Sequence, residues 1–304
     1  MSDKKTVNNA HGSLLGKETK YVSKYDKSLL FPIARKTARS THSLNMNVAK
    51  LQGFDLWTAW EISWLNPKGL PQVAVAEFRF PLSCESIVES KSFKLYLNSF
   101  NQTRFESIRT VRECMQTDLS LVTGGSVDVR LMTLKEAETY FQASSGSLAP
   151  FDIPSFLTAA HHQNKTVCLD QQDIQISGNP SDKSILTLDL NRKGRISEVV
   201  YSDLLKTNCP VTGQPDWASL WIYYKGVAIS HENLLRYVVG MREHQDFHEQ
   251  CVERIFYDIS AQCGPEQLLV YARYTRRGGL DINPLRTNIP LEQLTLNTVK
   301  LIRQ

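Results

Sequence analysis

The sequence has no apolar run approaching the ~18 residues that a membrane span needs, and its first residues lack the apolar core of a signal peptide. We therefore expect a cytoplasmic protein without membrane contact. Its six cysteines form no CxxC pair and match no histidine spacing of a zinc site, so no structural metal is expected. Without a secretion signal, reduced thiols are a better interpretation than disulfides. No GxGxxG motif follows a strand, so a nicotinamide cofactor would not be held on a Rossmann domain.

Positive charge gathers near the N-terminus. The chain has 304 residues and a formal net charge of +4 at pH 7. Residues 1–50 hold ten lysines and arginines against three acids, which makes this stretch a basic arm. Such an arm can meet nucleic acid or an anionic ligand, or it can be a solvated lead-in to the fold. The remainder lacks the basic face of a dedicated nucleic-acid binder, so no direct nucleic-acid binding is expected.

Apolar periodicity predicts an α+β protein with a sizeable core, since 41% of the residues are apolar. In the first half we expect strands at 57–65, 72–80 and 126–132, and helices at 91–100 and 104–119. Residues 144–200 are typical of a long connector with short strands at 166–169 and 185–190. In the second half we expect strands at 217–225, 226–230, 267–274 and 279–283, and helices at 231–243 and 247–263.

The order of these elements indicates an internal duplication. Residues 54–60 can be laid over 215–221 at an offset of 161, and residues 89–94 over 231–236 at an offset of 142. The first half would then carry 19 extra residues. The duplication predicts two ββααββ modules with antiparallel sheets and helices on one face.

The predicted modules span residues 51–143 and 201–304, on either side of the connector at 144–200. At the offset of 161, Cys209 aligns with Val48, so only the second half has the thiol. Each half thus contributes polar groups that the other lacks. This is expected if one composite site draws on both halves.

A thiol and a carboxylate lie seven positions apart in the segment Asn208–Trp217, which two prolines and a glycine punctuate. These residues predict a shaped loop. Cys209 could act as a nucleophile and Asp216 as a proton donor. Burial beside Trp217 would raise the pKa of Asp216 and make it a usable acid. The alternative is that Cys209 is a buried cysteine that packs as a small hydrophobe.

The pair His248–Glu249 opens a predicted helix. Asp246, three residues before Glu249, fits a capping box, which is a purely structural interpretation. The functional alternative is that Glu249 accepts N–H bonds from a heterocycle while His248 assists proton movement.

A second group of polar residues begins the first helix of the other half. Ser90 could cap that helix, with Lys91 and Lys94 on its solvated side. Alternatively, Glu89 could bind a purine-like edge and Lys91 a phosphate. The segment Arg276–Gly279 is a tight turn that suits phosphate, because guanidinium groups bind it and glycine permits close approach. A plain hairpin with solvated arginines is the alternative.

Four segments together resemble the NADPH-dependent 7-cyano-7-deazaguanine reductases, the nitrile reductases of queuosine biosynthesis, in their longer bimodular form. They are Glu89–Tyr96, the loop from Cys209 to Asp216, Phe247–Cys251 and Arg276–Pro284. Their order across a duplicated chain is far more specific than any single motif. The resemblance implies the tunnelling fold, in which ββααββ modules assemble into a barrel, and a cytoplasmic homodimer acting on a small-molecule nitrile.

The resemblance also implies roles for individual residues. Cys209 would be the nucleophile and Asp216 the proton donor, with His248 assisting. Substrate would be bound by Val88, Glu89, Ser90, His248 and Glu249. NADPH would be contacted by Ser90, Lys91, Arg277 and Gly278.

The implied chemistry adds the thiolate to the nitrile to form a thioimide, and two hydride transfers then yield the amine. No metal is required. GTP cyclohydrolase I, a zinc hydrolase, has the same fold, but the chain lacks its His/Cys constellation. A non-catalytic purine-binding module is a further alternative, which the co-occurrence of Cys209, Asp216 and His248 disfavours.

Overall fold

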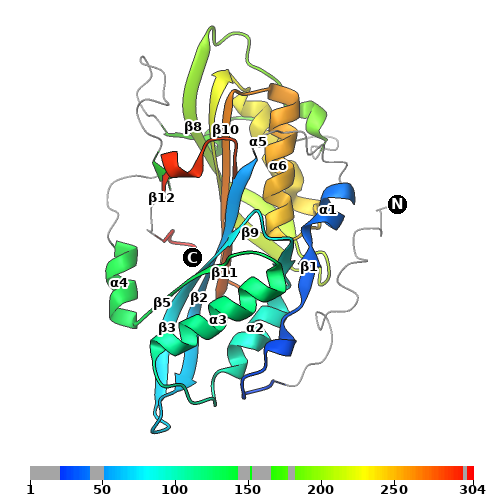
Figure 1. Ribbon diagram of the computed structural model, residues 1–304. Coiled ribbons are helices and arrows are strands. Elements are labelled where there is room, and N and C mark those ends of the chain that lie inside the picture. Colours follow the sequence, from blue (N-terminus) through cyan, green and yellow to red (C-terminus); the bar gives the residue numbers. More distant parts are fainter. Residues whose placement is uncertain (1–20, 42–50, 143–150, 153–165, 177–181, 297–299) are drawn as a thin grey trace.

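The computed structural model describes residues 21–41, 51–142, 151–152, 166–176, 182–296 and 300–304 (Figure 1). Within the basic arm lie the 3-10 helix η2 (Lys27–Leu29), strand β1 (Pro32–Ala34) and helix α1 (Arg35–Thr41). The first half continues with β2 (Gln52–Leu65), β3 (Pro71–Pro81), β4 (Ser86–Val88), α2 (Ser90–Ser99), α3 (Ile108–Thr123), β5 (Asp128–Met132), α4 (Leu134–Gln142) and β6 (Phe151–Asp152). The second half contains β7 (Thr166–Cys168), η3 (Leu169–Gln171), η4 (Lys183–Ile185), β8 (Arg195–Asn208), β9 (Pro215–Val227), α5 (His231–Gly240), η5 (Met241–Glu243), α6 (His248–Cys263), β10 (Gln267–Tyr274), β11 (Leu280–Thr287), η6 (Leu291–Gln293) and β12 (Thr295–Leu296).

One eight-stranded sheet runs through both halves in the order β5-β3-β2-β11-β10-β9-β8-β7. All neighbours pair antiparallel except β7 and β8, which are parallel. The halves join where β2 meets β11, from the pair Leu280↔Ala59 to the pair Thr287↔Gln52. The predicted α+β architecture with antiparallel pairing is confirmed.

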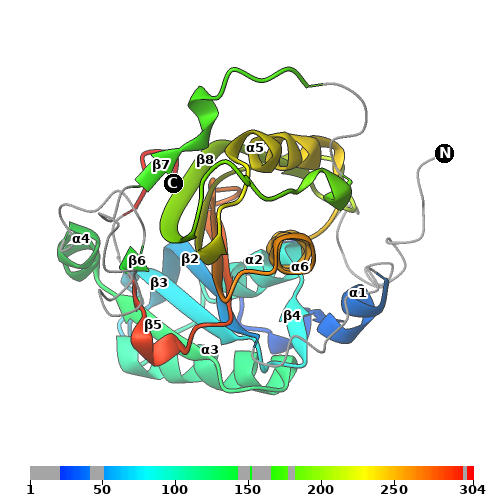
Figure 2. The same cartoon turned by 90° about the horizontal axis from the view of Figure 1, so that it is seen from above.

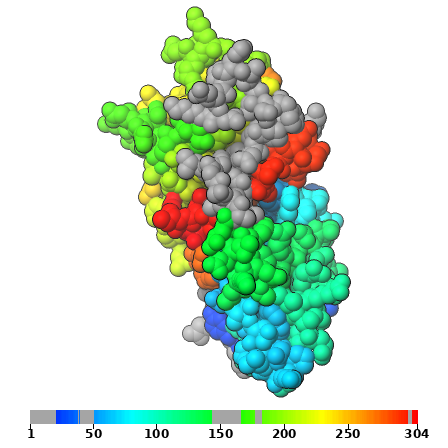
Figure 3. Space-filling view, turned by 90° about the vertical axis from the view of Figure 1, so that its left-hand side faces the viewer, coloured from blue at the N-terminus to red at the C-terminus, as the bar shows by residue number. Residues whose placement is uncertain are grey.

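Helices α2, α3, α5 and α6 lie on one side of the sheet (Figures 1 and 2). The alternation of strand side chains explains this arrangement. In β9, Leu220 and Ile222 belong to the core beneath the helices, whereas Trp221 and Tyr223 face the opposite side. Helix α4 packs on that opposite side, through contacts of Ala137, and Figure 3 shows it there beside the C-terminal residues in red. The prediction that the helices share one face is therefore wrong for α4.

The duplication is visible in the element order, but not in the predicted register. The elements β2, β3, α2, α3 and β5 begin 143, 144, 141, 140 and 139 residues before β8, β9, α5, α6 and β10. A β-bulge interrupts the first hairpin between Ala59 and Ile62, and another lies between Ser202 and Leu205, again 143 residues on. The offset of 161 is wrong because it laid β2 over β9, and the 19 extra residues disappear with it.

Several predicted elements differ from the observed ones. Strand β8 was not predicted at all, and it begins at Arg195, inside the stretch assigned to the connector. Residues 185–190 contain the end of η4, a single antiparallel bridge from Leu188 to Ile229 and the start of a turn, rather than a strand. Residues 226–227 belong to β9, so no separate strand exists at 226–230. In the first half, β5 is followed by α4 rather than by a second strand of the main sheet.

All six cysteines are free thiols, as predicted. In the described residues, no helix is long and apolar enough to cross a membrane.

Candidate active site

Residues from both halves line one small pocket on the helix side of the sheet. The first half contributes Trp57, Val88 and Ser90. The second half contributes Cys209, Pro210, Asp216, Asp246, Phe247, His248, Glu249, Arg277 and Ile282. The pocket thus brings together the predicted nucleophile, the predicted proton donor and three of the residues assigned to substrate binding in addition to His248. This is the composite site that the sequence predicted.

Cys209 opens the tight turn between β8 and β9. Its backbone N–H donates to Gln214 O at 2.8 Å, and Gly213 N–H donates back to Cys209 O at 3.0 Å. Gly213 has φ 67°, a conformation that glycine adopts without strain. The predicted loop is therefore a hairpin turn whose flanks are strand, and it holds the Cys209 side chain almost fully buried at 3% exposure.

Asp216 lies on β9 at the edge of the pocket. His248 Nε2 is 3.3 Å from its Oδ2, and Arg277 Nη2 is 3.5 Å from its Oδ1. Burial acts to raise the pKa of Asp216, but His248, Arg277 and Lys94 together bring that pKa below its ordinary value. The expectation of a raised pKa is wrong, because Trp217 points outward and three cationic or hydrogen-bonding neighbours outweigh burial.

His248 and Glu249 form the first turn of α6. The helix is capped by its own Gln250, whose Oε1 accepts from Phe247 N–H at 3.4 Å, so the predicted capping box of Asp246 and Glu249 is wrong. The His248 ring stacks on Tyr274 at 3.9 Å between centroids. Within the described part of the chain, His248 Nδ1 and Glu249 Oε1 are buried without a hydrogen-bond partner. Buried polar atoms without partners are rare, and at a pocket they indicate a ligand.

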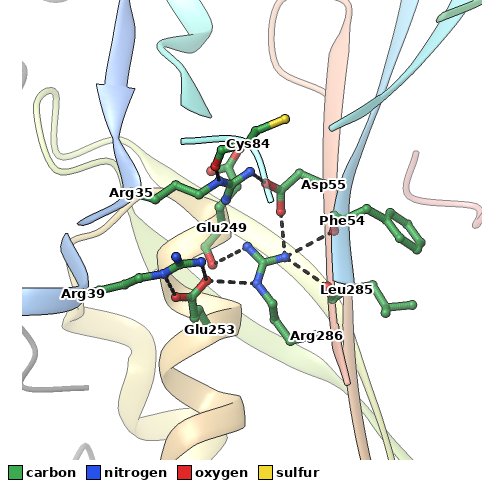
Figure 4. A network of polar contacts seen from close by, with 9 residues as sticks. All are labelled: Arg35, Arg39, Phe54, Asp55, Cys84, Glu249, Glu253, Leu285 and Arg286. Carbon is green, nitrogen blue, oxygen red and sulfur yellow. Dashed lines mark hydrogen bonds and ion pairs between the residues drawn. The ribbon is translucent and has the colours of Figure 1, made fainter. Parts of the chain in front are cut away.

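The Glu249 carboxyl group is 3% exposed. Burial, followed by the nearby Asp55, raises its pKa to about 7, although Arg35 and Arg286 act in the opposite direction. Figure 4 shows these groups behind Glu249, with Arg286 reaching its backbone carbonyl. At neutral pH, Glu249 is therefore close to its titration midpoint.

Glu89 caps helix α2, in place of the Ser90 cap considered from the sequence. Its two carboxylate oxygens accept from Lys91 N–H at 2.7 Å and Ser92 N–H at 2.8 Å. The residue is completely buried. Val88 and Ser90 on either side of it line the pocket, so Glu89 fixes the strand-to-helix turn that presents them.

The turn between β10 and β11 carries Arg277 to the same pocket, whereas the neighbouring Gly278 does not line it. Arg277 Nη1 donates to Gln214 Oε1 at 2.9 Å, which ties this turn to the Cys209 turn. Arg276 lies instead over the ring of Trp60 at 3.6 Å, so only one of the paired arginines lines the pocket. The predicted phosphate turn therefore offers one guanidinium to the pocket, and Gly278 lies beside Lys94 of α2.

Comparison with known proteins decides the family. Residues 21–131 match the model described as "Nitrile reductase, 7-cyano-7-deazaguanine-reductase N-term", and residues 215–292 match that of "QueF-like protein". The NADPH-dependent 7-cyano-7-deazaguanine reductase of Saccharophagus degradans is 48% identical over 274 residues, 90% of this chain and 93% of the relative. The enzyme of the same name from Hydrogenovibrio crunogenus is 46% identical over 300 residues, 99% of both chains.

The chain belongs to the NADPH-dependent 7-cyano-7-deazaguanine reductase family.

The family models cover all of the predicted site residues except Cys209, which lies between the two matched ranges. A relative from Burkholderia thailandensis, also named as this reductase, is 48% identical over 92% of this chain and 94% of its own length. The resemblance inferred from the four sequence segments is thereby confirmed.

Sequence reasoning missed that Lys94 lies close to residues of this pocket. It was placed on the solvated side of α2, yet an ideal Cβ on Gly278 would lie 3.3 Å from Lys94 Cδ. Burial and the nearby Arg277 lower the pKa of Lys94 to about 8, while Glu89, Asp216 and Cys209 act against that shift. Its spacing of one helical turn from Ser90 could have signalled that both face the site.

A larger cavity, of about 190 Å³, lies on the opposite side of the sheet. It contains none of the predicted site residues. Its two acids lie opposite arginines in the β3–β5 register, Glu77 opposite Arg130 and Asp128 opposite Arg79. We therefore assign the chemistry to the smaller pocket, where the thiol lies.

Proposed function

We propose that this protein reduces the nitrile of 7-cyano-7-deazaguanine to the 7-aminomethyl amine with NADPH, as a cytoplasmic step of queuosine biosynthesis. One observation carries the proposal beside the family relationship: a single pocket holds a thiol, a carboxylate with a lowered pKa, and a carboxyl group with one oxygen that has no hydrogen-bond partner in the described residues. These are Cys209, Asp216 and Glu249.

Substrate recognition is assigned to the starts of two helices. Glu249 accepts N–H bonds from the deazaguanine ring, which its unpaired Oε1 supports. His248 stacks on Tyr274 and fixes one wall of the pocket. Val88 and Ser90 also line the pocket, and Glu89, which lies between them, binds the base by exchanging one of its backbone N–H bonds.

The covalent step uses the Cys209–Asp216 pair. Because the pKa of Asp216 is lowered, this carboxylate is ionised before substrate binds and can accept the thiol proton. The Cys209 sulfur then attacks the nitrile carbon, the C≡N bond loses one π pair to nitrogen, and Asp216 returns the proton to that nitrogen. The product is a thioimide. His248, 3.3 Å from Asp216, orients the carboxylate throughout.

The residues present fit a phosphate-bearing dinucleotide. Arg277 is partly exposed at 32%, Gly278 permits close approach of the backbone, and Lys94 and Lys91 add positive charge on the facing helix. Ser90, Lys91, Arg277 and Gly278 would hold NADPH, which supplies hydride when bound. Since Cys209 is almost completely buried, the site also shields the thioimide from hydrolysis.

The tandem tunnelling fold and the homodimer are part of the same proposal. The recurrent strand–strand–helix–helix–strand order and the matching bulges support two modules, 51–143 and 201–304. Strands β5 and β7 end the described sheet, and each pairs with only one neighbouring strand there. A second copy that pairs at these edges would close the sheet. Direct binding of nucleic acid is not part of the proposal.

The proposal is tested by following NADPH oxidation with 7-cyano-7-deazaguanine as the only acceptor. We expect two NADPH consumed for each amine formed. Turnover of NADPH without amine, or release of a hydrolysed product, would contradict it.

A further inference from the structure

The described part of the basic arm, residues 21–41, packs against elements that carry residues of the proposed substrate site. Strand β1 pairs with β4 from Pro32↔Val88 to Ala34↔Ser86, immediately before Glu89. The Phe31 carbonyl also accepts from Glu89 N–H at 2.9 Å. Beyond this strand, α1 directs two arginines toward the acids behind Glu249 (Figure 4). The arm therefore contacts the elements that carry Glu89 and Glu249, the two carboxyl groups proposed to bind the substrate.

Asp55 is the centre of a buried ionic cluster. Arg35 Nη2 lies 2.6 Å from its Oδ2, and Arg286 Nη1 lies 2.8 Å from its Oδ1. Arg286 also contacts Glu253 Oε2 at 3.1 Å and the Glu249 carbonyl at 3.4 Å. All these side chains except Arg39, the second arginine on Glu253, are at most 6% exposed.

The charges in this cluster balance only when Glu249 is ionised. Three arginines, Arg35, Arg39 and Arg286, face the two acids Asp55 and Glu253. An ionised Glu249 supplies the third negative charge. Because charges in a low-dielectric interior interact strongly, removing one member changes the energy of the others.

We propose that Arg35 is a positioning residue for the substrate: acting through Asp55, it keeps Glu249 ionised and able to accept N–H bonds. This inference rests on the proposed role of Glu249 in substrate binding. Asp55 alone would disfavour a second negative charge nearby, and Arg35 offsets that effect. The basic arm is then part of the active site's electrostatics rather than a solvated lead-in.

Charged and titratable groups approach Glu249 from each element packed around it. They are Arg35 on α1, Asp55 on β2, Arg286 on β11, Tyr274 on β10, and His248 and Glu253 on α6. The pKa of Glu249 is about 7, and Arg35 lowers it while Asp55 raises it. Protonated Glu249 has lost the negative charge that strengthens the substrate's N–H bonds, so affinity should fall as pH drops through this pKa.

Two substitutions should therefore move the pH midpoint of binding in opposite directions. Arg35→Met removes the favourable charge and should raise the midpoint by about one unit. Asp55→Asn removes the unfavourable charge and should lower it by about one unit. Each unit is a tenfold change in Kd on the acidic side. Arg35→Lys, which keeps the charge, should leave the midpoint close to that of the parent.

The measurement is calorimetric titration of 7-cyano-7-deazaguanine from pH 5.5 to 9 in a Cys209→Ala parent, which cannot form the covalent adduct. Arg39→Met is the matched control, because Arg39 lies one turn along α1 and pairs with Glu253 rather than Asp55. It should lower the melting temperature and move the midpoint by much less than one unit, because Arg39 is more exposed and does not contact Asp55.

Opposite shifts for Arg35→Met and Asp55→Asn support the inference. Midpoints that stay with the parent, or that move together in the three variants, overturn it. A parent that fails to bind the nitrile at any pH overturns the proposed function instead.

Discussion

Replacing Glu249 by Gln should weaken substrate binding and stabilise the protein at the same time. Glu249 does not cap α6, and its Oε1 has no hydrogen-bond partner in the described residues. The substitution therefore leaves the capping of α6 by Gln250 intact. It removes a buried charge that is proposed to accept N–H bonds from the substrate.

The effect on stability follows from the raised pKa. A carboxyl group that goes from 4.5 to about 7 on folding holds its proton more tightly in the folded state. Its contribution to the free energy of unfolding is therefore lost as pH rises from about 4.5 to about 7, by as much as about 3 kcal/mol. Gln does not titrate. The difference in stability between the variant and wild type should therefore grow as pH rises from 5 to 8. Most of this growth should occur below pH 7.

The effect on binding follows from losing a charge-assisted hydrogen bond, worth about 1.5–3 kcal/mol. That corresponds to a Kd about 10- to 150-fold weaker at pH 8. Thermal unfolding at both pH values and calorimetric titration of the nitrile measure the two effects. A stability difference that does not change with pH, together with wild-type affinity, would refute the reasoning and leave Glu249 without a role in recognition.

Further predictions concern the turn that carries Arg277. Arg277→Lys loses the guanidinium contacts to Gln214 and Asp216. Steady-state kinetics should then show that KM for NADPH rises about tenfold and that KM for the nitrile rises less. An equal rise in both would count against a cofactor role. Lys94→Met removes a positive charge that lowers the pKa of Asp216, so the acidic limb of kcat/KM for the nitrile should move to higher pH, and an unmoved limb would speak against Asp216 as the proton carrier. Gly278→Ala changes a residue at φ 64° that lies close to Lys94, so it should lower stability by about 1–2 kcal/mol and also lower activity. Gly213→Ala changes a residue at φ 67° with open space around its Cβ, so it should show only the stability loss in thermal unfolding. Equal activity losses in the two glycine variants would show that the Lys94 contact has no influence.

The segments around the site were predictable because local chemistry determines them. The prolines and glycine near Cys209 require a turn, and the hydrophobic spacing after His248 requires a helix. Recognition of the family needed only the order of these segments. What the sequence could not show is how the segments influence one another's charges, such as the lowered pKa of Asp216.

Strand β8 escaped prediction for a physical reason. Ile196 and Val200 face the helices, and after the bulge between Ser202 and Leu205 the inward positions change from even to odd numbers. A bulge of this kind destroys the period of two on which strand prediction depends. Strand β2 shows the same switch, but its tryptophans made it recognisable. Missing β8 then forced the offset of 161, because the second hairpin had no first strand to align.

The basic arm shows a different limit. Its composition indicated only positive charge, and two interpretations remained open. The structure directs Arg35 to Asp55, a residue 20 positions later and almost completely buried. Such long-range pairing leaves no periodic signal in a single sequence.

Intact-mass analysis of the protein with 7-cyano-7-deazaguanine, in the absence of NADPH, tests the central claim most directly. The account predicts one added substrate mass on the wild-type chain, none on Cys209→Ala, and loss of the adduct when NADPH is supplied. Cys251→Ala is a suitable control, because Cys251 is also completely buried but does not line the pocket, and it should keep the adduct. An adduct that persists in Cys209→Ala, or a wild-type enzyme that forms amine while Cys209→Ala does so equally fast, would contradict the assignment of Cys209 as the nucleophile.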